Sequence, residues 1–154
     1  MGTAVADQMQ LVEKKFAQAD HLESVAAHLR GSQPDDAAQL DQVATELIDE
    51  VGFVRVKVAA ELLDVDVKTV THWYDRGVFR SSRVDPCHPR VQTLDPIVVR
   101  AVYSIVRELR ALGKANRQTL LEQVWHRLQD KAELESSDVQ AGLAAWRAGD
   151  IVEA

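Results

Sequence analysis

Hydrophobic residues recur every three or four positions along the first fifty residues, the spacing of one face of an α-helix. The first run ends at Gly31, and a second begins at Pro34 and ends at Gly52. Because only a few residues separate the two predicted helices, they are expected to form an antiparallel hairpin. The apolar positions of the two stripes are Val5, Met9, Val12, Phe16, Ala19, Leu22, Val25, Leu29, Leu40, Val43, Leu47 and Val51.

The last third of the chain is also predicted to be helical. Asp95 and Pro96 provide an N-cap and a proline at the first helical position, and the apolar pattern continues to Gly113. A further helix is expected over residues 116–128. Ser137 is placed to cap a last helix, and the chain ends in an acidic tail.

Two short helices are predicted in the centre, over residues 58–63 and 67–74. Ala60 lies where two such helices would cross closely, and Val70 is placed to anchor the second helix in the core. Asp64 occupies the connecting turn, which favours positive φ, and aspartate is one of the few non-glycine residues that tolerates it. The layout is that of a helix-turn-helix.

The outward face of the second helix carries the candidate base contacts. With Ala60, Val70 and Trp73 facing inward, its polar and basic side chains face outward or lie at the margin, and Asp66 is placed to cap its N-terminus. In this motif the N-terminal end of the second helix enters the major groove of DNA. The alternative is a solvated helix face. The candidate DNA-binding residues here are Lys68, Thr69, Thr71 and His72.

Arginines follow the second helix, around a turn marked by Pro86 and Pro89. The flanking extended stretches predict a small β-hairpin, or wing. Residues 76–91 hold 4 arginines against one acid, so the wing is a candidate clamp on phosphates or the minor groove. The alternative is that these side chains pair with nearby acids on a solvated loop. They are Arg76, Arg80, Arg83 and Arg90.

The central sequence Val65-Asp66-Val67-Lys68-Thr69-Val70-Thr71-His72-Trp73, followed by Arg76-Gly77-Val78-Phe79, resembles the winged helix-turn-helix proteins of the MerR and excisionase superfamily. The resemblance covers residues 54–94. It implies DNA contacts from Lys68, Thr71 and His72 in the helix, and from Arg80, Arg83 and Arg90 in the wing. Residues 95–113 are too few for the long dimer coiled coil of MerR regulators proper, and no cysteine pattern provides for a metal effector.

Charge is distributed in blocks that the net charge of −6 hides. Residues 1–51 contain 3 basic and 10 acidic residues, residues 52–117 contain 12 and 7, and residues 118–154 contain 3 and 7. A basic centre between acidic flanks is expected when one segment meets a polyanion and the others meet protein or solvent.

No arrangement of residues indicates an enzyme. The five histidines are scattered, Cys87 is the one cysteine, and no glycine-rich phosphate loop occurs, so no catalytic site, cofactor or metal ion is expected. A lone cysteine fits a reducing compartment. No apolar run is long enough for a membrane span, and the first ten residues do not read as a signal peptide, so we expect a cytoplasmic protein without membrane contact.

These observations predict a mainly α-helical, sequence-selective DNA-binding regulator, with a dimerisation hairpin at 1–52, a winged helix-turn-helix at 53–95 and a helical region with an acidic tail at 96–154. A homodimer is expected because one short recognition helix makes few contacts, and the long stripe of the hairpin suggests the interface. The C-terminal sequence resembles the tails of DNA-binding antitoxins in bacterial toxin–antitoxin operons, which implies a toxin partner and autoregulation. The competing hypothesis is a helical protein-interaction adaptor that does not bind DNA.

Overall fold

The computed structural model of the protein describes residues 2–113 and 120–135, which form helices and one two-stranded antiparallel sheet. The prediction of a mainly helical protein with a small β element is therefore confirmed. The predicted helix from Ser137 and the acidic tail lie outside the described residues. The elements are α1 Gly2–Leu29, α2 Pro34–Val51, β1 Val54–Arg55, α3 Val56–Leu63, α4 Val67–Asp75, β2 Thr93–Leu94, α5 Pro96–Ala111 and α6 Leu120–Glu135.

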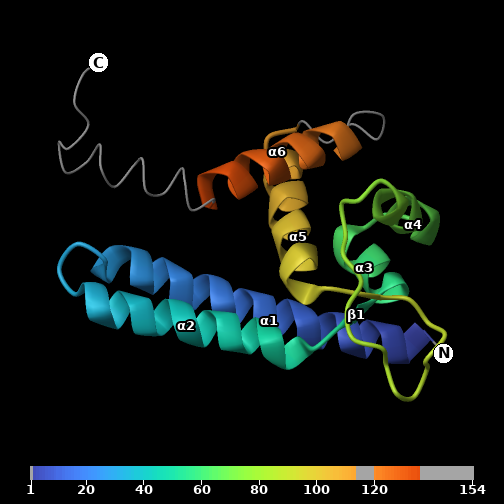
Figure 1. Cartoon of the computed structure of the whole chain (residues 1–154), viewed down its shortest axis with the longest axis horizontal. Coiled ribbons are helices and arrows are strands. Elements are labelled where there is room, and N and C mark those ends of the chain that lie inside the picture. The colour runs from blue at the N-terminus through green and yellow to red at the C-terminus, as the bar shows by residue number, and fades with distance from the viewer. Residues whose placement is uncertain (1, 114–119, 136–154) are drawn as a thin grey trace. The chain divides into compact units, whose positions relative to one another are not determined.

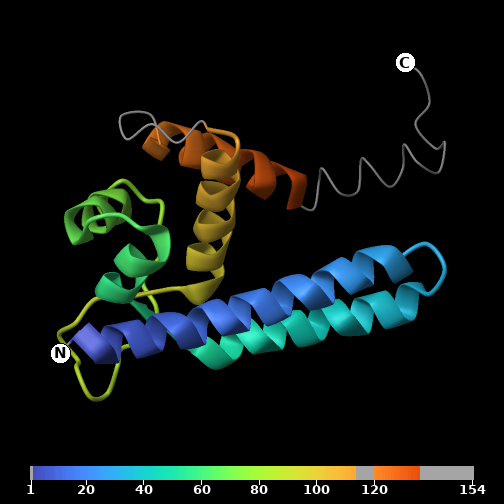
Figure 2. The same ribbon diagram turned by 180° about the vertical axis from the view of Figure 1, so that it is seen from behind.

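The chain divides into two compact units, residues 1–104 and 105–154. In the first unit, α1 and α2 lie side by side as an antiparallel hairpin (Figures 1 and 2). The amide of Gln33 donates 2.7 Å to the carbonyl of Leu29 at the tip, and Pro34 then begins α2. Gly52 ends α2 with φ of 76°, a conformation that glycine adopts without steric cost. The predicted hairpin is confirmed, as are the predicted start of its second helix at Pro34 and the end of that helix at Gly52.

Small side chains fill the seam between α1 and α2. Ala19 and Ala26 of α1, and Ala37 and Ala44 of α2, are each at most 1% exposed. The members of each pair lie seven residues apart, so they share one face of their helix. Alanine has no side chain beyond Cβ, and the two helices can therefore approach closely along this line.

Two valines of the predicted apolar stripes lie outside the core of the unit. Val25 is 37% exposed and Val43 is 44% exposed, while the neighbouring Ala26 and Ala44 are buried. The reason is geometric: a period of three or four residues allows either neighbour to face inward, and the close approach of the helices selects the smaller one.

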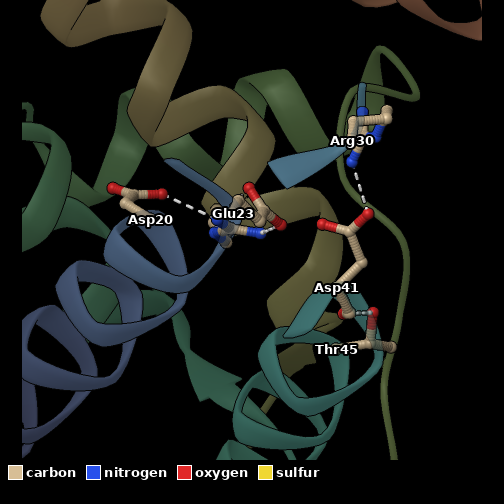
Figure 3. A network of polar contacts seen from close by, with 6 residues as sticks. Asp20, Glu23, Arg30, Asp41 and Thr45 are labelled. Atoms are coloured by element: carbon tan, nitrogen blue, oxygen red, sulfur yellow. Dashed lines mark hydrogen bonds and ion pairs between the residues drawn. The ribbon is translucent and has the colours of Figure 1, made fainter. Parts of the chain in front are cut away.

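Ion pairs at both ends of the hairpin hold its register. Lys15 Nζ lies 2.8 Å from Glu50, and Arg30 donates 2.6 Å to Asp41, whose backbone carbonyl also accepts the hydroxyl of Thr45 (Figure 3). Pairs this exposed contribute about 0–1 kcal/mol each. They therefore specify the alignment of the two helices more than they stabilise them.

The first part of α5 packs on one flank of α1. The capping prediction is confirmed, because the carboxylate of Asp95 accepts the amide of Ile97 at 3.0 Å. Arg100 then makes two bonds of 2.9 and 2.8 Å to Glu23 and one of 2.7 Å to Asp20 (Figure 3). The Glu23 carboxylate, followed by that of Asp20, raises the pKa of Arg100. Beside this contact, the rings of Phe16 and Tyr103 lie 5.7 Å apart.

Part of the apolar stripe of α1 that suggested a dimer interface is buried within the same chain. Val12 is 6% exposed, Phe16 1% and Ala19 0%, and α1 contacts both α2 and α3. Removal of residues 1–31 would therefore open the core of the first unit. These buried residues cannot serve as a surface for a second subunit, and dimerisation through the hairpin stays a prediction that depends on the rest of the stripe.

The second unit contains α6 and the C-terminal part of α5, from Ile105 onward. Val106, Leu109, Leu120 and Val124 are buried, and Arg127 of α6 donates 2.9 Å to Glu108 of α5. Within the described residues, no helix has the length and apolar character needed to cross a membrane.

Enlarging a seam alanine should destabilise the protein. We expect Ala44→Leu to lower the free energy of unfolding by about 1–3 kcal/mol, because the added carbons must force apart two closely packed helices. Urea denaturation followed by circular dichroism measures the change. Ala17→Leu, on the exposed face of α1, is the matched control and should change stability little. Equal effects from the two variants would contradict the close seam.

Candidate nucleic-acid interface

The turn between α3 and α4 has the backbone conformation that the sequence predicted, with a positive φ at Asp64. Asp64 adopts the left-handed conformation, with φ of 52° and ψ of 51°. Its amide donates 3.3 Å to the carbonyl of Glu61, and the amide of Val65 donates 3.0 Å to that of Ala60. These bonds satisfy carbonyls at the end of α3 and let the chain turn directly into α4.

Side chains of α3 and α4 that were expected in the core are buried. Ala60 is 4% exposed, Val70 0% and Trp73 3%. α3 and α4 pack against each other, and the buried position of Ala60 agrees with the expected close crossing of the two helices. Burial of Val70 and Trp73 fixes the rotation of α4, so its opposite face meets solvent.

The outward face of α4 carries three of its four predicted contact residues. Lys68, Thr71 and His72 are exposed, whereas Thr69 is half-buried and less accessible. The hydroxyl of Thr71 donates 3.0 Å to the carbonyl of Val67, which leaves its methyl group and its acceptor lone pairs for a ligand.

Asp66 stands at the N-cap of α4, but the predicted side-chain cap is absent. Its backbone carbonyl accepts the amides of Thr69 at 3.0 Å and Val70 at 3.2 Å, while its carboxylate accepts no capping bond. The first-turn amides of α4 are therefore not satisfied by this side chain. Such amides at the positive end of a helix dipole suit a phosphate oxygen.

The end of α4 turns the chain back with a glycine. Gly77 has φ of 88°, its amide donates 2.9 Å to the carbonyl of Tyr74, and the amide of Val78 donates 3.0 Å to that of Trp73. This pair of bonds is a Schellman motif, which favours glycine for its left-handed residue. Phe79 then stacks on Trp73, with ring centroids 6.3 Å apart. Arg76, at the C-cap, is exposed.

Residues 80–95 form what we call the arginine loop, which runs from the end of α4 back toward β1 (Figure 1). Its two limbs meet at an antiparallel bridge between Ser81 and Leu94. Just beyond it, the amide of Ser82 donates 3.1 Å to the carbonyl of Thr93. The phenol of Tyr74 is 2.7 Å from the Ser81 hydroxyl, and this bond is the main cause that lowers the pKa of Tyr74.

The predicted β-hairpin is not what forms here. β2 pairs with β1, Val54 opposite Leu94 and Arg55 opposite Thr93, so the strand partner lies before α3 in the chain. Beyond the bridge the loop has no ladder of its own. Its outer part is bonded locally instead, with the amide of His88 donating 3.0 Å to the carbonyl of Asp85 and that of Val91 donating 3.1 Å to the carbonyl of His88.

An ion pair that the sequence did not reveal fixes the arginine loop to β1. Arg55 donates 2.6 Å to Asp85, whose side chain is 6% exposed, and the second carboxylate oxygen of Asp85 accepts the amide of Cys87 at 2.9 Å. The Arg55 bond first, and the Cys87 amide second, lower the pKa of Asp85. The Asp-Pro-Cys sequence could have suggested the local turn, but not a partner 30 residues away.

The four predicted arginines are exposed and without carboxylate partners. Within residues 2–113 and 120–135, no ion pair includes Arg76, Arg80, Arg83 or Arg90, nor Lys68 of α4. The one acid among these arginines, Asp85, is occupied by Arg55. The alternative in which they pair with nearby acids therefore does not hold in the described part of the chain.

Two other kinds of site have less support. A pocket of about 180 Å³ lies between the N-terminal part of α1, the end of α2 and β1, with Leu11, Phe53 and Arg55 in its lining. Its volume is below the roughly 300–1,000 Å³ of ordinary ligand pockets. Among the residues whose placement is described, no group of three or more His, Cys, Asp or Glu side chains could hold a metal ion.

No protein family model matches this chain, and no curated protein or solved structure matches it either. What the protein does must therefore be inferred from the geometry and charge of the site.

Loss of the Asp85 carboxylate should lower stability in a pH-dependent way. The unfolded chain protonates Asp85 near its ordinary pKa of 3.8, and the folded protein does so only at lower pH. The ion pair thus stabilises fully above that value, and its contribution disappears as the pH falls through the lower folded pKa. We expect Asp85→Asn to reduce the thermal midpoint at pH 7, and the difference from wild type to shrink below pH 3.8.

Thermal melts over a pH series measure this difference. Asp66→Asn is the control, because its carboxylate makes no capping bond and its removal should change the midpoint less. If both substitutions shift the midpoint equally at neutral pH, Asp85 has no special role in holding the loop.

Proposed function

We propose that this protein is a sequence-selective DNA-binding regulator that works through a winged helix-turn-helix, with α4 in the major groove and the arginine loop on the DNA backbone. The observation that carries the proposal is the division among the described arginines. Arg30, Arg55, Arg100 and Arg127 each pair with a carboxylate, and Arg107 and Arg110 also have interactions, whereas no ion pair between described residues includes the four around α4 and the arginine loop. Unpaired guanidinium groups gathered in one segment are what phosphate binding requires.

The local geometry supports separate roles for the helix and the loop. Lys68, Thr71 and His72 stand on the exposed face of α4, near enough to its N-terminus to meet base edges or phosphates. Arg80 and Arg83 lie on the limb of the loop that is bonded to β2, so their backbone is held in place. A clamp built on a fixed backbone loses little entropy when it binds.

Autoregulation as an antitoxin is the more specific version of this proposal. It adds a toxin that the C-terminal segment would bind, and an adjacent reading frame encoding a small toxin would support it. A gel-shift series distinguishes DNA binding from the adaptor hypothesis. It uses the DNA upstream of the gene for this protein and random duplexes. Absence of binding to either DNA at low salt would favour the adaptor.

Removal of loop charges should weaken binding to all sequences. We expect Arg80→Ala and Arg83→Ala each to reduce the slope of log K against log salt by about 0.9 for each phosphate that the arginine neutralises. The comparison uses fluorescence anisotropy on a random duplex over a series of salt concentrations. Arg30→Ala, at the hairpin tip, is the matched control and should leave the slope unchanged. A slope that stays constant in the loop variants would remove the loop from the interface.

Changes on α4 should act on specificity instead. Thr71→Ala or His72→Ala should cost about 1–3 kcal/mol on a site selected from a random duplex library, because alanine cannot reach the base edges. Binding to random DNA at the same ionic strength should be nearly unchanged. Equal effects on selected and random DNA would show that these side chains contact only the backbone.

A further inference from the structure

Half of the apolar positions predicted for the two stripes lie along one flank of the α1–α2 hairpin and are not fully buried. Both helices carry the same pattern, leucine followed by valine three residues later and leucine after four more. We call this surface the hairpin face. Its residues are Leu22, Val25, Leu29, Leu40, Val43 and Leu47.

All six side chains lie on one flank of the alanine seam. Leu22 and Leu29 come three residues after Ala19 and Ala26, and the α2 leucines come three residues after Ala37 and Ala44. Because the helices are antiparallel, an equal offset on both places the leucines on the same side of the hairpin.

The opposite flank is the one that α5 covers. Phe16 and Glu23, which contact Tyr103 and Arg100, come three residues before the seam alanines of α1. The hairpin face is thus not the surface on which the first part of α5 packs.

The hairpin face remains partly open to solvent. Val25 and Val43 are 37% and 44% exposed, and the four leucines are half-buried. Contiguous aliphatic groups in this state mark a surface that another protein element covers.

We infer that a second copy of this chain covers the hairpin face, forming an antiparallel four-helix bundle. The face suits a copy of itself because its two antiparallel helices repeat one Leu-Val-Leu pattern, so identical faces meet in matching apolar layers. The inference rests on the proposed function, because a dimer of this kind would present two α4 helices to the two half-sites of a DNA operator.

Charges along the edges of the face select the stacking. The outer edge of α2 carries Asp36, Glu46 and Glu50, all exposed and all acidic, and Glu50 also pairs with Lys15 of α1. The outer edge of α1 is mixed, with Asp7, Lys14, His21 and His28 exposed at steps of seven residues. Stacking α2 on the partner's α2 would place like charges opposite each other. The arrangement of α1 on the partner's α2 avoids this, and it makes every neighbouring pair of helices antiparallel.

The area is sufficient for a reversible dimer. The 18 residues of α2 span about 27 Å, and two adjacent helices are roughly 20 Å wide, so stacking along the whole hairpin, its polar ends included, covers about 500 Å² on each copy. The hairpin face itself, eight residues long on each helix, supplies about 240 Å² of this. A total near 1,000 Å² lies at the lower limit for specific interfaces. We therefore expect association that depends on protein concentration in the micromolar range.

The first experiment tests whether the hairpin face associates. Sedimentation equilibrium of the full chain without DNA should show a monomer–dimer equilibrium that the double variant Val25→Glu, Val43→Glu abolishes. Both positions are exposed, so the fold should persist, and circular dichroism checks this. Ala17→Glu, elsewhere on the surface of α1, should leave the equilibrium unchanged. A wild-type chain that remains monomeric up to about 100-fold above the expected micromolar range, or a double variant that still dimerises, would overturn the inference.

The second experiment tests the stacking. In a Cys87→Ser background, Val25→Cys and Val43→Cys are made as separate proteins and oxidised alone or mixed. A disulfide-linked dimer that forms only in the mixture is expected, because α1 of one copy then lies on α2 of the other. Linkage within either protein alone, or none in the mixture, would overturn this arrangement. Neither experiment contains DNA, so their failure is distinguishable from failure of DNA binding, which the anisotropy series measures on its own.

Discussion

Close packing of α1 against α2 along their alanines is the constraint on which the rest of the first unit depends. A seam of small residues brings the two helices together and leaves no room there for Val25 and Val43, which lie on the outside. The packing also turns Phe16, Asp20 and Glu23 of α1 toward α5. There, Tyr103 contacts Phe16, and Arg100 binds the two carboxylates. The small size of the seam alanines thus determines which side chains lie on the flank that α5 covers and which lie on the open flank.

Electrostatic pairing divides the molecule in a second way. In the hairpin and at its contact with α5, Lys15, Arg30 and Arg100 pair with carboxylates, and Arg100 is held by two of them. Around α4 and the arginine loop the cations have no such partners in the described chain. A cation without an internal partner gains more from an external anion, because it has no existing ion pair to give up. The contrast ties the proposed function to the fold, since matched charges hold the hairpin and unmatched charges remain for DNA.

The arginine loop connects these two regions. Its base is bonded to β2, and its outer part is tied to β1 by Asp85 and Arg55. Strand β1 follows directly from α2, so the position of the loop is linked to the end of the hairpin. If two hairpins associate through the hairpin face, the loops and α4 helices of both copies belong to units whose internal geometry is set by the same buried contacts.

Local backbone chemistry by itself determined where the helices of this protein begin and end. Pro34, Gly52, Asp64 and Asp95 each act on their own neighbours, through a permitted φ, a missing amide hydrogen or a capping oxygen, and the sequence is enough to place the helices that they bound. The exposed positions of Lys68, Thr71 and His72 followed in the same way, from the periodicity of one helix. DNA binding by these residues stays a prediction.

Tertiary structure alone decided what depends on a distant partner. Periodicity cannot tell Val25 from Ala26 as the buried residue, because the choice depends on how closely α2 approaches. It could not pair Arg55 with Asp85, or β2 with β1 instead of with a neighbouring strand, because those contacts join residues far apart in the chain. It also could not show that four arginines lack carboxylate partners among the residues that the structure describes. That property belongs to the space around a side chain, which forms only when the whole unit has folded.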